Sequence, residues 1–186
     1  EAFFGCTGIT SLVFDRNPQK PLQIGKSAFS GCSNIAGDIE IDRLVYYSTQ
    51  TNKIIPEKAF YGCSSIHSIV LPNEITRISS GAFYGCTGLE SINLPRSLAS
   101  IQANSFYRCS NLNIDLVIPN QVVTIGEYAF YECTSFKSIS IGYSVTTIGK
   151  YAFCRCKFTG DIIIPRVTQI PEGAFLGCEG LNGILE

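Results

Sequence analysis

Apolar side chains recur along this chain with a period of about 23 residues. The clearest marker is Phe-x-x-Cys preceded by a small residue, as in IGEYAFYEC at 125–133. Its cysteine occurs eight times, at Cys6, Cys32, Cys63, Cys86, Cys109, Cys133, Cys156 and Cys178, with successive spacings of 26, 31, 23, 23, 24, 23 and 22 residues. Such a period predicts a solenoid, because one short unit cannot bury its apolar face without its neighbours.

The remainder of each unit predicts a short β-strand. In SSIHSIVLP (64–72) and TGLESINLP (87–95) the last apolar residues alternate with polar ones, which is typical of a strand with one buried face. Proline follows directly at Pro72, Pro95, Pro119 and Pro165, and proline ends a strand because it has no N–H to donate. We therefore expect strands of about three to five residues.

The segment that leads to each cysteine predicts a short helix or helical turn. Ile125, Ala129, Phe130 and Cys133 lie at positions i, i+4, i+5 and i+8, which fits one face of a helix. Other units begin this segment with Pro-Glu, as at 56–57 and 171–172, and both residues are favourable in a first helical turn. The pattern predicts an α/β solenoid of about eight units of ~23 residues, with strands on one side and helical segments on the other.

The recurring Phe and Cys are interpreted as a buried column, in which Cys fills a slot for a small apolar side chain. The expected column consists of Phe29, Cys32, Phe60, Cys63, Phe83, Cys86, Phe106, Cys109, Phe130, Cys133, Phe153, Cys156, Phe175 and Cys178. Free thiols are favoured over a disulfide framework because eight of nine cysteines share one repeat position. Cys109→Ser is expected to destabilise the fold, because the hydroxyl has no assured partner. Cys154 takes a place held by tyrosine in other units, and a metal site with Cys156 would need further ligands.

Composition excludes several classes of protein. Net charge is −1 with both signs scattered, so no basic stripe suggests nucleic acid, and no apolar run reaches the length of a transmembrane helix. With 45% hydrophobic residues the chain is expected to fold, as a single solenoid domain over 1–186. The chain opens on Glu1 rather than Met and contains units cut at both ends, so further repeats or capping segments are expected outside it.

Two whole units, LESINLPRSLASIQANSFYRC (89–109) and FKSISIGYSVTTIGKYAFCRC (136–156), resemble the BspA-type leucine-rich repeat, and the resemblance extends over almost the entire chain. It implies a right-handed, curved superhelix with the strands on the concave side. It also implies a surface protein or adhesin of anaerobic bacteria or protists that binds host extracellular proteins, with no catalytic residues and no cofactor. The sequence departs from the pattern at RNPQKP (16–21) and DRLVYYSTQTNK (42–53).

The outward strand positions and the second of these insertions form the candidate partner-binding surface. Its residues are Asp38, Glu40, Tyr46, Tyr47, Ser68, Ser91, Asn93, Asp115, Ser138, Ser140 and Asp161. A merely solvated face is the alternative reading for the carboxylates. Tyr61, Tyr84, Tyr107 and Tyr131 follow the buried Phe and are expected to line up, either as packing between units or as part of an interface.

These features favour a non-catalytic binding module that recognises a protein, such as a host extracellular protein, or a glycan at the cell surface or after secretion. An intracellular, cytoplasmic scaffold with the same fold is the alternative. An enzyme is disfavoured: His67 is the only histidine, no Ser or Cys is placed for its activation, and an open sheet gives paired carboxylates no water-free cleft. Neither a metal nor another cofactor, and no nucleic-acid partner or membrane insertion, is expected.

Overall fold

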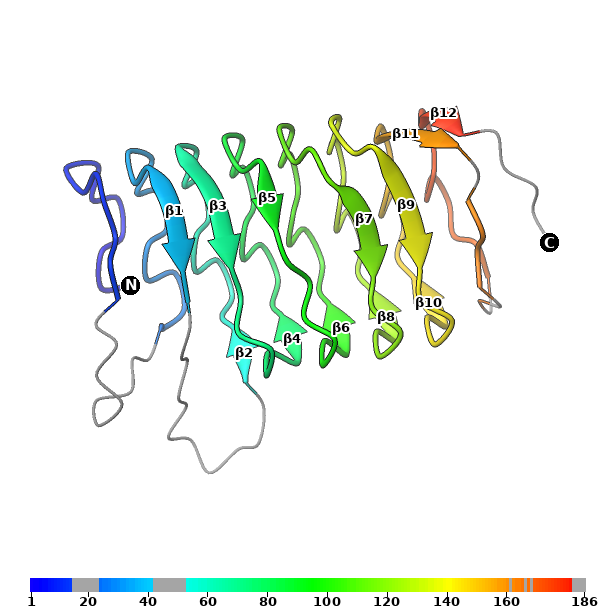
Figure 1. Cartoon of the computed structure of the whole chain (residues 1–186), viewed down its shortest axis with the longest axis horizontal. Coiled ribbons are helices and arrows are strands. Elements are labelled where there is room, and N and C mark those ends of the chain that lie inside the picture. The colour runs from blue at the N-terminus through cyan, green and yellow to red at the C-terminus, as the bar shows by residue number, and fades with distance from the viewer. Residues whose placement is uncertain (15–23, 42–52, 161, 166, 168, 182–186) are drawn as a thin grey trace.

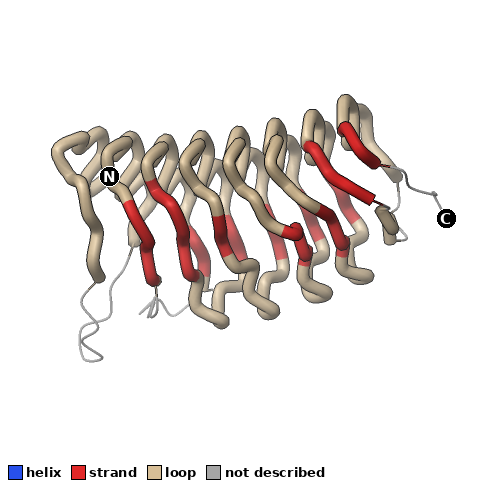
Figure 2. The backbone as a smooth tube through the Cα atoms, turned by 45° about the horizontal axis from the view of Figure 1, so that its top comes forward, coloured by secondary structure: helices blue, strands red, loops and turns tan. Residues whose placement is uncertain are grey.

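The computed structural model describes residues 1–14, 24–41, 53–160, 162–165, 167 and 169–181. In these ranges the chain forms short strands and turns and no helix (Figure 2). The strands are β1 (Gly37–Glu40), β2 (Ile54–Ile55), β3 (Ile66–Val70), β4 (Arg77–Ile78), β5 (Ser91–Ile92), β6 (Ser100–Ile101), β7 (Asp115–Ile118), β8 (Thr124–Ile125), β9 (Ser138–Ile141), β10 (Thr147–Ile148), β11 (Lys157–Gly160) and β12 (Glu179–Leu181). No helix in the described ranges is long and apolar enough to span a membrane.

Each regular turn of the chain adds one strand to a front face and one strand to a back sheet, and paired strands are parallel, so the protein is a parallel β-solenoid (Figure 1). The strands β1, β3, β5, β7 and β9 form what we call the front face, in two pieces with orders β1-β3-β5 and β7-β9. The strands β2, β4, β6, β8 and β10 form one continuous back sheet. Its five strands define about five regular turns; the right-handed, curved form and the count of eight units stay predictions.

The front face confirms the prediction of short strands with one buried side. On β7, Leu116 and Ile118 are buried while Asp115 and Val117 are exposed, and β9 repeats the alternation. The two strands pair in register, Asp115 with Ser138 and Leu116 with Ile139, so that apolar rows continue from turn to turn beneath the sheet. Burial of these rows against the other side of the coil supplies the main driving force for stacking.

The predicted helical segments are wrong. From Gly126 to Cys133 the chain makes consecutive tight turns, in which Ala129 N–H donates to the carbonyl of Gly126 at 3.3 Å and Cys133 N–H to that of Phe130 at 3.2 Å. Alternate amides donate to the next turn instead: Phe130 N–H to the carbonyl of Ala152 at 2.7 Å and Glu132 N–H to that of Cys154 at 2.9 Å. An α-helix needs every amide for its own i−4 carbonyl, so this division of donors excludes it.

Backbone angles give a second reason for the missing helix. Two positions in each turn have positive φ, one two residues before the buried Phe and one two residues after it. In one turn they are Tyr128 (φ 54°) and Glu132 (φ 56°), and elsewhere glycine takes the second place, as at Gly62 (φ 70°). Left-handed residues interrupt a right-handed helix, and here they reverse the chain so that Phe130 and Cys133 both face inward.

The Phe and Cys motifs form the centre of the core. The rings of Phe60, Phe83 and Phe106 stack with centroids 5.7 and 5.3 Å apart, and Phe side chains of all eight motifs continue this column in both directions. Every Phe from Phe29 to Phe153 and every Cys from Cys32 to Cys156 in the motif is buried, whereas Phe175 and Cys178 in the last described turn are half-buried.

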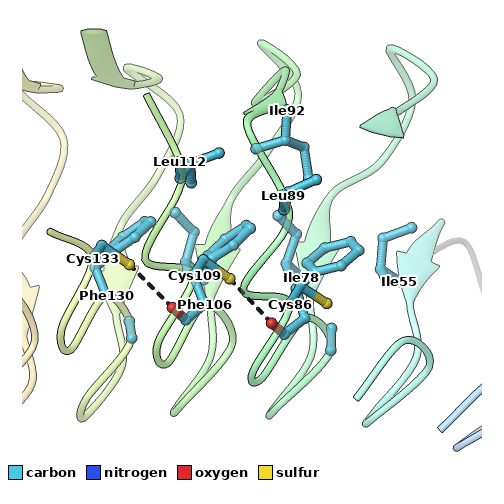
Figure 3. Packing of buried hydrophobic residues seen from close by; sticks show 14 of the residues in the cluster. Ile55, Ile78, Cys86, Leu89, Ile92, Phe106, Cys109, Leu112, Phe130 and Cys133 are labelled. Atoms are coloured by element: carbon cyan, nitrogen blue, oxygen red, sulfur yellow. Dashed lines mark hydrogen bonds between the residues drawn. The ribbon is translucent and has the colours of Figure 1, made fainter. Parts of the chain in front are cut away.

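The cysteines also hold neighbouring turns together. The thiol of Cys109 donates a hydrogen bond to the carbonyl of Phe83 at 3.1 Å, and that of Cys133 to the carbonyl of Phe106 at 3.1 Å (Figure 3). The same bond, to the carbonyl of the motif Phe in the preceding turn, recurs for Cys32, Cys63, Cys86, Cys156 and Cys178. The sequence analysis interpreted Cys only as a small apolar side chain that fills the core. The structure adds a second role, because the S–H group also donates a hydrogen bond to the neighbouring turn.

Candidate binding surface

The structure places most of the predicted site on the front face. Asp38 and Glu40 lie on β1, Ser68 on β3 and Ser91 on β5, while Asn93 follows β5 directly. The same face continues with Asp115 on β7 and Ser138 and Ser140 on β9. Tyr46, Tyr47 and Asp161 lie outside the described residues. The front face is therefore made mostly of small polar side chains at the outward positions of its strands.

Two carboxylates of this face are already bound within it. Ser68 Oγ donates to Asp38 Oδ1 at 2.6 Å, and Ser138 Oγ donates to Asp115 Oδ1 at 2.6 Å. Each pair joins neighbouring strands, β1 with β3 and β7 with β9, in register. Each carboxylate therefore forms a cross-strand side-chain pair, and such pairs stabilise the sheet.

The side chain of Asn93 forms hydrogen bonds with the backbone of the preceding turn. Its Oδ1 accepts a hydrogen bond from the Leu71 N–H at 2.6 Å, and its Nδ2 donates to the Leu71 carbonyl at 2.8 Å. The side-chain amide thus takes the place that a backbone residue of β5 would hold if that strand continued beside β3. Both polar atoms of the Asn93 side chain are hydrogen-bonded within the protein. The side chain that the sequence analysis proposed for partner binding therefore has a structural role.

The front face is interrupted between β5 and β7, where a cavity of about 820 Å³ opens. One wall comes from residues 92–94 and Arg96 and the other from residues 114–121, and Ser140 and Tyr143 complete the lining. Arg96 and Tyr143 were not among the predicted site residues. The one signal for this place in the sequence is the 24-residue spacing from Cys109 to Cys133, between units of 23 residues.

Exposed apolar side chains accompany the polar ones on this surface. Val70 on β3 is 50% exposed, Val117 on β7 is 59% exposed and Tyr143 is 74% exposed. In a row otherwise built of serine and aspartate they supply the apolar area that a partner can cover.

The predicted tyrosine column exists and is packed against itself. The rings of Tyr61, Tyr84 and Tyr107 stack at 4.5 Å between centroids, and Tyr131 continues the column at 4.8 Å from Tyr107. The faces of the inner rings therefore contact one another, which leaves edges and hydroxyls at the half-buried surface. Packing between turns accounts for the column, and an interface role stays a prediction.

Burial makes the column cysteines poor nucleophiles. It raises the pKa of the Cys63 thiol to about 12, and it raises the pKa of the Cys86, Cys109 and Cys133 thiols well above the ordinary value. The thiolate is the reactive form, so these groups stay protonated donors near neutral pH. All nine cysteines are free thiols, Cys154 being buried in the place of the next tyrosine.

The remaining chemical candidates are ordinary surface groups. His67 is exposed on β3, with Nε2 at 3.4 Å from Glu90 Oε1 in the next turn. In the part of the chain that the structure describes, no group of three His, Cys, Asp or Glu side chains could hold a metal ion.

Comparisons with known proteins agree with this architecture. A leucine-rich repeat protein of Treponema pallidum is 31% identical over 78% of this chain and 67% of its own length, with a TM-score of 0.70. A leucine-rich repeat protein from Bacteroides ovatus is 27% identical over 78% of this chain, with a TM-score of 0.62, and this chain covers 45% of it. A leucine rich cell surface protein from Faecalibacterium prausnitzii is less similar, with 20% identity and a TM-score of 0.46. Among curated proteins no relative matches.

The family model described as the BspA type leucine rich repeat region matches six copies over residues 1–51 and 53–182. That match includes both sheets and the whole Phe column, so the resemblance seen in the sequence is confirmed. The chain belongs to the BspA-type leucine-rich repeat family.

Proposed function

We propose that this chain is a non-catalytic binding module that recognises a protein partner through its front face, on a cell surface or after secretion. The observation that carries the proposal is the composition of that face: exposed Val70 and Val117 stand among small hydroxyl and carboxylate side chains on regular parallel strands. Protein interfaces place apolar contact area within a polar rim, and Val70 and Val117 supply apolar area on this face.

The charges of the face support a protein over a nucleic acid. The acidic side chains that point outward from β1 and β7, namely Asp38, Glu40 and Asp115, would repel a phosphate backbone. Membership in a repeat family without catalytic motifs, and extended faces displayed by a solenoid, also support binding rather than catalysis. A glycan partner and an intracellular scaffold are the competing assignments.

The test is a binding comparison of matched variants. Val70→Arg combined with Ser91→Arg places two large charges at the centre of the face, on β3 and β5. Val123→Arg, beside β8 of the back sheet and 46% exposed, is the control. The immobilised wild type and both variants are presented with purified extracellular-matrix proteins, a glycan array and a cytoplasmic extract.

We expect the wild type and the control variant to retain an extracellular protein that the double variant loses. Retention of the same protein by all three forms would exclude the front face as the site. A partner found only on the glycan array, or only in the cytoplasmic extract, would favour one of the competing assignments.

A further inference from the structure

The break in the front face leaves two strand edges without backbone partners. β5 pairs with β3 only, and β7 pairs with β9 only. On one side of the break the Asn113 N–H donates to the carbonyl of Glu90 at 3.0 Å, and on the other the Val123 N–H donates to that of Ala99 at 2.9 Å. Between these two contacts no backbone hydrogen bond joins the two turns among the described residues.

One additional residue causes the break. Ser91, which pairs with Ser68, follows its motif cysteine Cys86 by five positions, whereas Asp115, which pairs with Ser138, follows Cys109 by six. The extra residue precedes β7 and shifts that strand relative to β5. Figure 1 shows the chain leaving β5 early while β7 begins farther along. The back sheet is unaffected, since Ser100 of β6 still pairs with Thr124 of β8.

Asn93 borders the break and does not bridge it. Its side-chain amide binds the Leu71 backbone of the preceding turn with both polar atoms, so neither is directed to β7. The space at the break is the cavity of about 820 Å³ lined mainly by residues 92–94, Arg96 and residues 114–121. It therefore follows from the shifted register of the sheet.

The two edges determine what can occupy the cavity. A free strand edge presents alternating N–H and C=O groups, and these are complementary to the extended backbone of another chain. The exposed Val117 at one wall and Tyr143 at the margin offer apolar contacts to alternate side chains. A glycan would match the regular backbone spacing of neither edge.

The charges select the kind of peptide. Arg96 is the one basic residue among those that line the cavity, and it forms no ion pair in the described part of the chain. The acidic lining residue, Asp115, already accepts the hydroxyl of Ser138 at 2.6 Å. Asp115 keeps its charge but is hydrogen-bonded within the sheet, whereas Arg96 has no ion pair in the described part of the chain, so Arg96 is the group that can pair with a carboxylate of a ligand.

We propose that the gap between β5 and β7 binds an extended, acidic peptide segment of a partner protein, which adds a strand between the two edges and pairs a carboxylate with Arg96. This deepens the proposed function, on which it rests, by naming the class of ligand and the mode of recognition.

The test uses a short synthetic peptide of alternating serine and valine with glutamate at both ends, acetylated and amidated. Two controls share its length: one has N-methyl groups on alternate residues, which removes the donors along one edge, and one has lysine in place of glutamate. Titration is followed by NMR of the labelled protein. Amide hydrogen exchange of residues 91–94 and 115–118 reports whether both edges become protected.

We expect the acidic peptide to bind and to slow exchange at both edges, and the N-methylated peptide to fail. Arg96→Glu should weaken the acidic peptide by about tenfold or more, because one charge-assisted contact is lost, and should favour the lysine peptide. Arg77→Glu on β4, the matched control, should change nothing. Deletion of Asn113, which restores the 23-residue spacing, should close the gap and abolish binding if that variant folds.

Equal binding of the N-methylated peptide would overturn strand addition, and no binding by either charged peptide at millimolar concentration would overturn the proposal as a whole. Its failure is separable from that of the proposed function. Suppose a partner binds Arg96→Glu normally but does not bind the Val70→Arg, Ser91→Arg double variant. The front face would then still be the binding site, and the gap between β5 and β7 would not be part of it.

Discussion

At the scale of single residues, the stacked Phe rings are the most sensitive part of the core. Phe83 is fully buried between Phe60 and Phe106, at 5.7 and 5.3 Å between centroids. Phe83→Ala should lower the free energy of unfolding by about 3–5 kcal/mol, because it opens a cavity that both neighbours border. Phe4→Ala removes a ring that is 61% exposed and should cost about 0.5 kcal/mol or less. Urea denaturation compares them; equal losses would contradict the buried column.

The thiol of Cys109 has a partner that its sequence position did not reveal, and the expected effect of Cys109→Ser changes accordingly. A serine hydroxyl at this position can donate to the carbonyl of Phe83, as the thiol does at 3.1 Å. We expect Cys109→Ser and Cys109→Ala each to cost about 1–2 kcal/mol, one from burial of a hydroxyl and the other from a small cavity and a lost donor. Chemical denaturation measures both, and a serine variant clearly less stable than the alanine one would show that the carbonyl cannot accept the hydroxyl.

Alkaline pH should destabilise the fold through the same column. Burial raises the pKa of Cys63 from 9.0 to about 12 and that of Cys178 to about 11. A raised folded-state pKa means that the stabilisation is complete below the unfolded value and is lost as pH rises from there through the folded value. The free energy of unfolding should therefore fall from about pH 9 upward, by about 1.4 kcal/mol per pH unit for Cys63 and by less for the half-buried Cys178.

Denaturant midpoints measured over this alkaline range provide the check. Cys63→Ala should reduce the slope by the contribution of one thiol, since it removes one proton that the unfolded chain releases and the folded chain retains. An identical slope for the variant and the wild type would contradict the protonated column.

At the scale of elements, the front strands were predictable and the rest of each turn was not. The alternation in SISI at 138–141 identifies β9 directly, whereas two-residue strands such as β8 are too short to show a period. The spacing of Ile125, Ala129 and Phe130 matched a helical face because consecutive tight turns also bring these residues inward. Sequence patterns report which residues face the core, and several backbone paths satisfy the same pattern.

The substitution Asn93→Ala tests how much stability a side chain contributes when its hydrogen bonds replace those of a strand. Asn93→Ala removes the two hydrogen bonds to the Leu71 backbone and should lower the free energy of unfolding by about 1–2 kcal/mol. Asn111→Ala is the control, because that exposed side chain forms no hydrogen bond in the described part of the chain. Thermal melts compare the two variants. Equal stability of both would show that water replaces the Asn93 bonds at no cost.

At the scale of the whole molecule, contacts run from each turn to the next, and the sequence predicted this order because its period is visible. Glu132 shows the principle among charged groups: it accepts hydrogen bonds from Arg108 in the preceding turn at 2.7 Å and from Arg155 in the following turn at 2.9 Å. Burial alone would raise the pKa of Glu132, but the bonds from both arginines outweigh it and hold the pKa below the ordinary value. The interruption after β5 was not predictable, since one inserted residue does not show which contacts it breaks.

The substitution Glu132→Gln tests whether a carboxylate that binds arginines of two neighbouring turns stabilises the fold more than an ordinary surface ion pair does. We expect a loss of about 1 kcal/mol that shrinks as salt is added, because one carboxylate serves two arginines and is mostly covered. Glu74→Gln removes a pair of 3.6 Å between exposed side chains and should have almost no effect. A loss that does not change with salt would point to packing, and not to charge, as the origin.

The row of hydrogen-bonded thiols bears on where such a protein can work. From Cys32 to Cys156 each motif thiol donates a hydrogen bond to the turn before it and is buried, so oxidants and other thiols reach these sulfurs only when the coil opens. Nine cysteines would ordinarily argue for residence in a reducing environment. Because the buried motif thiols are unreactive while the protein stays folded, their number is compatible with an oxidising environment as well as a reducing one.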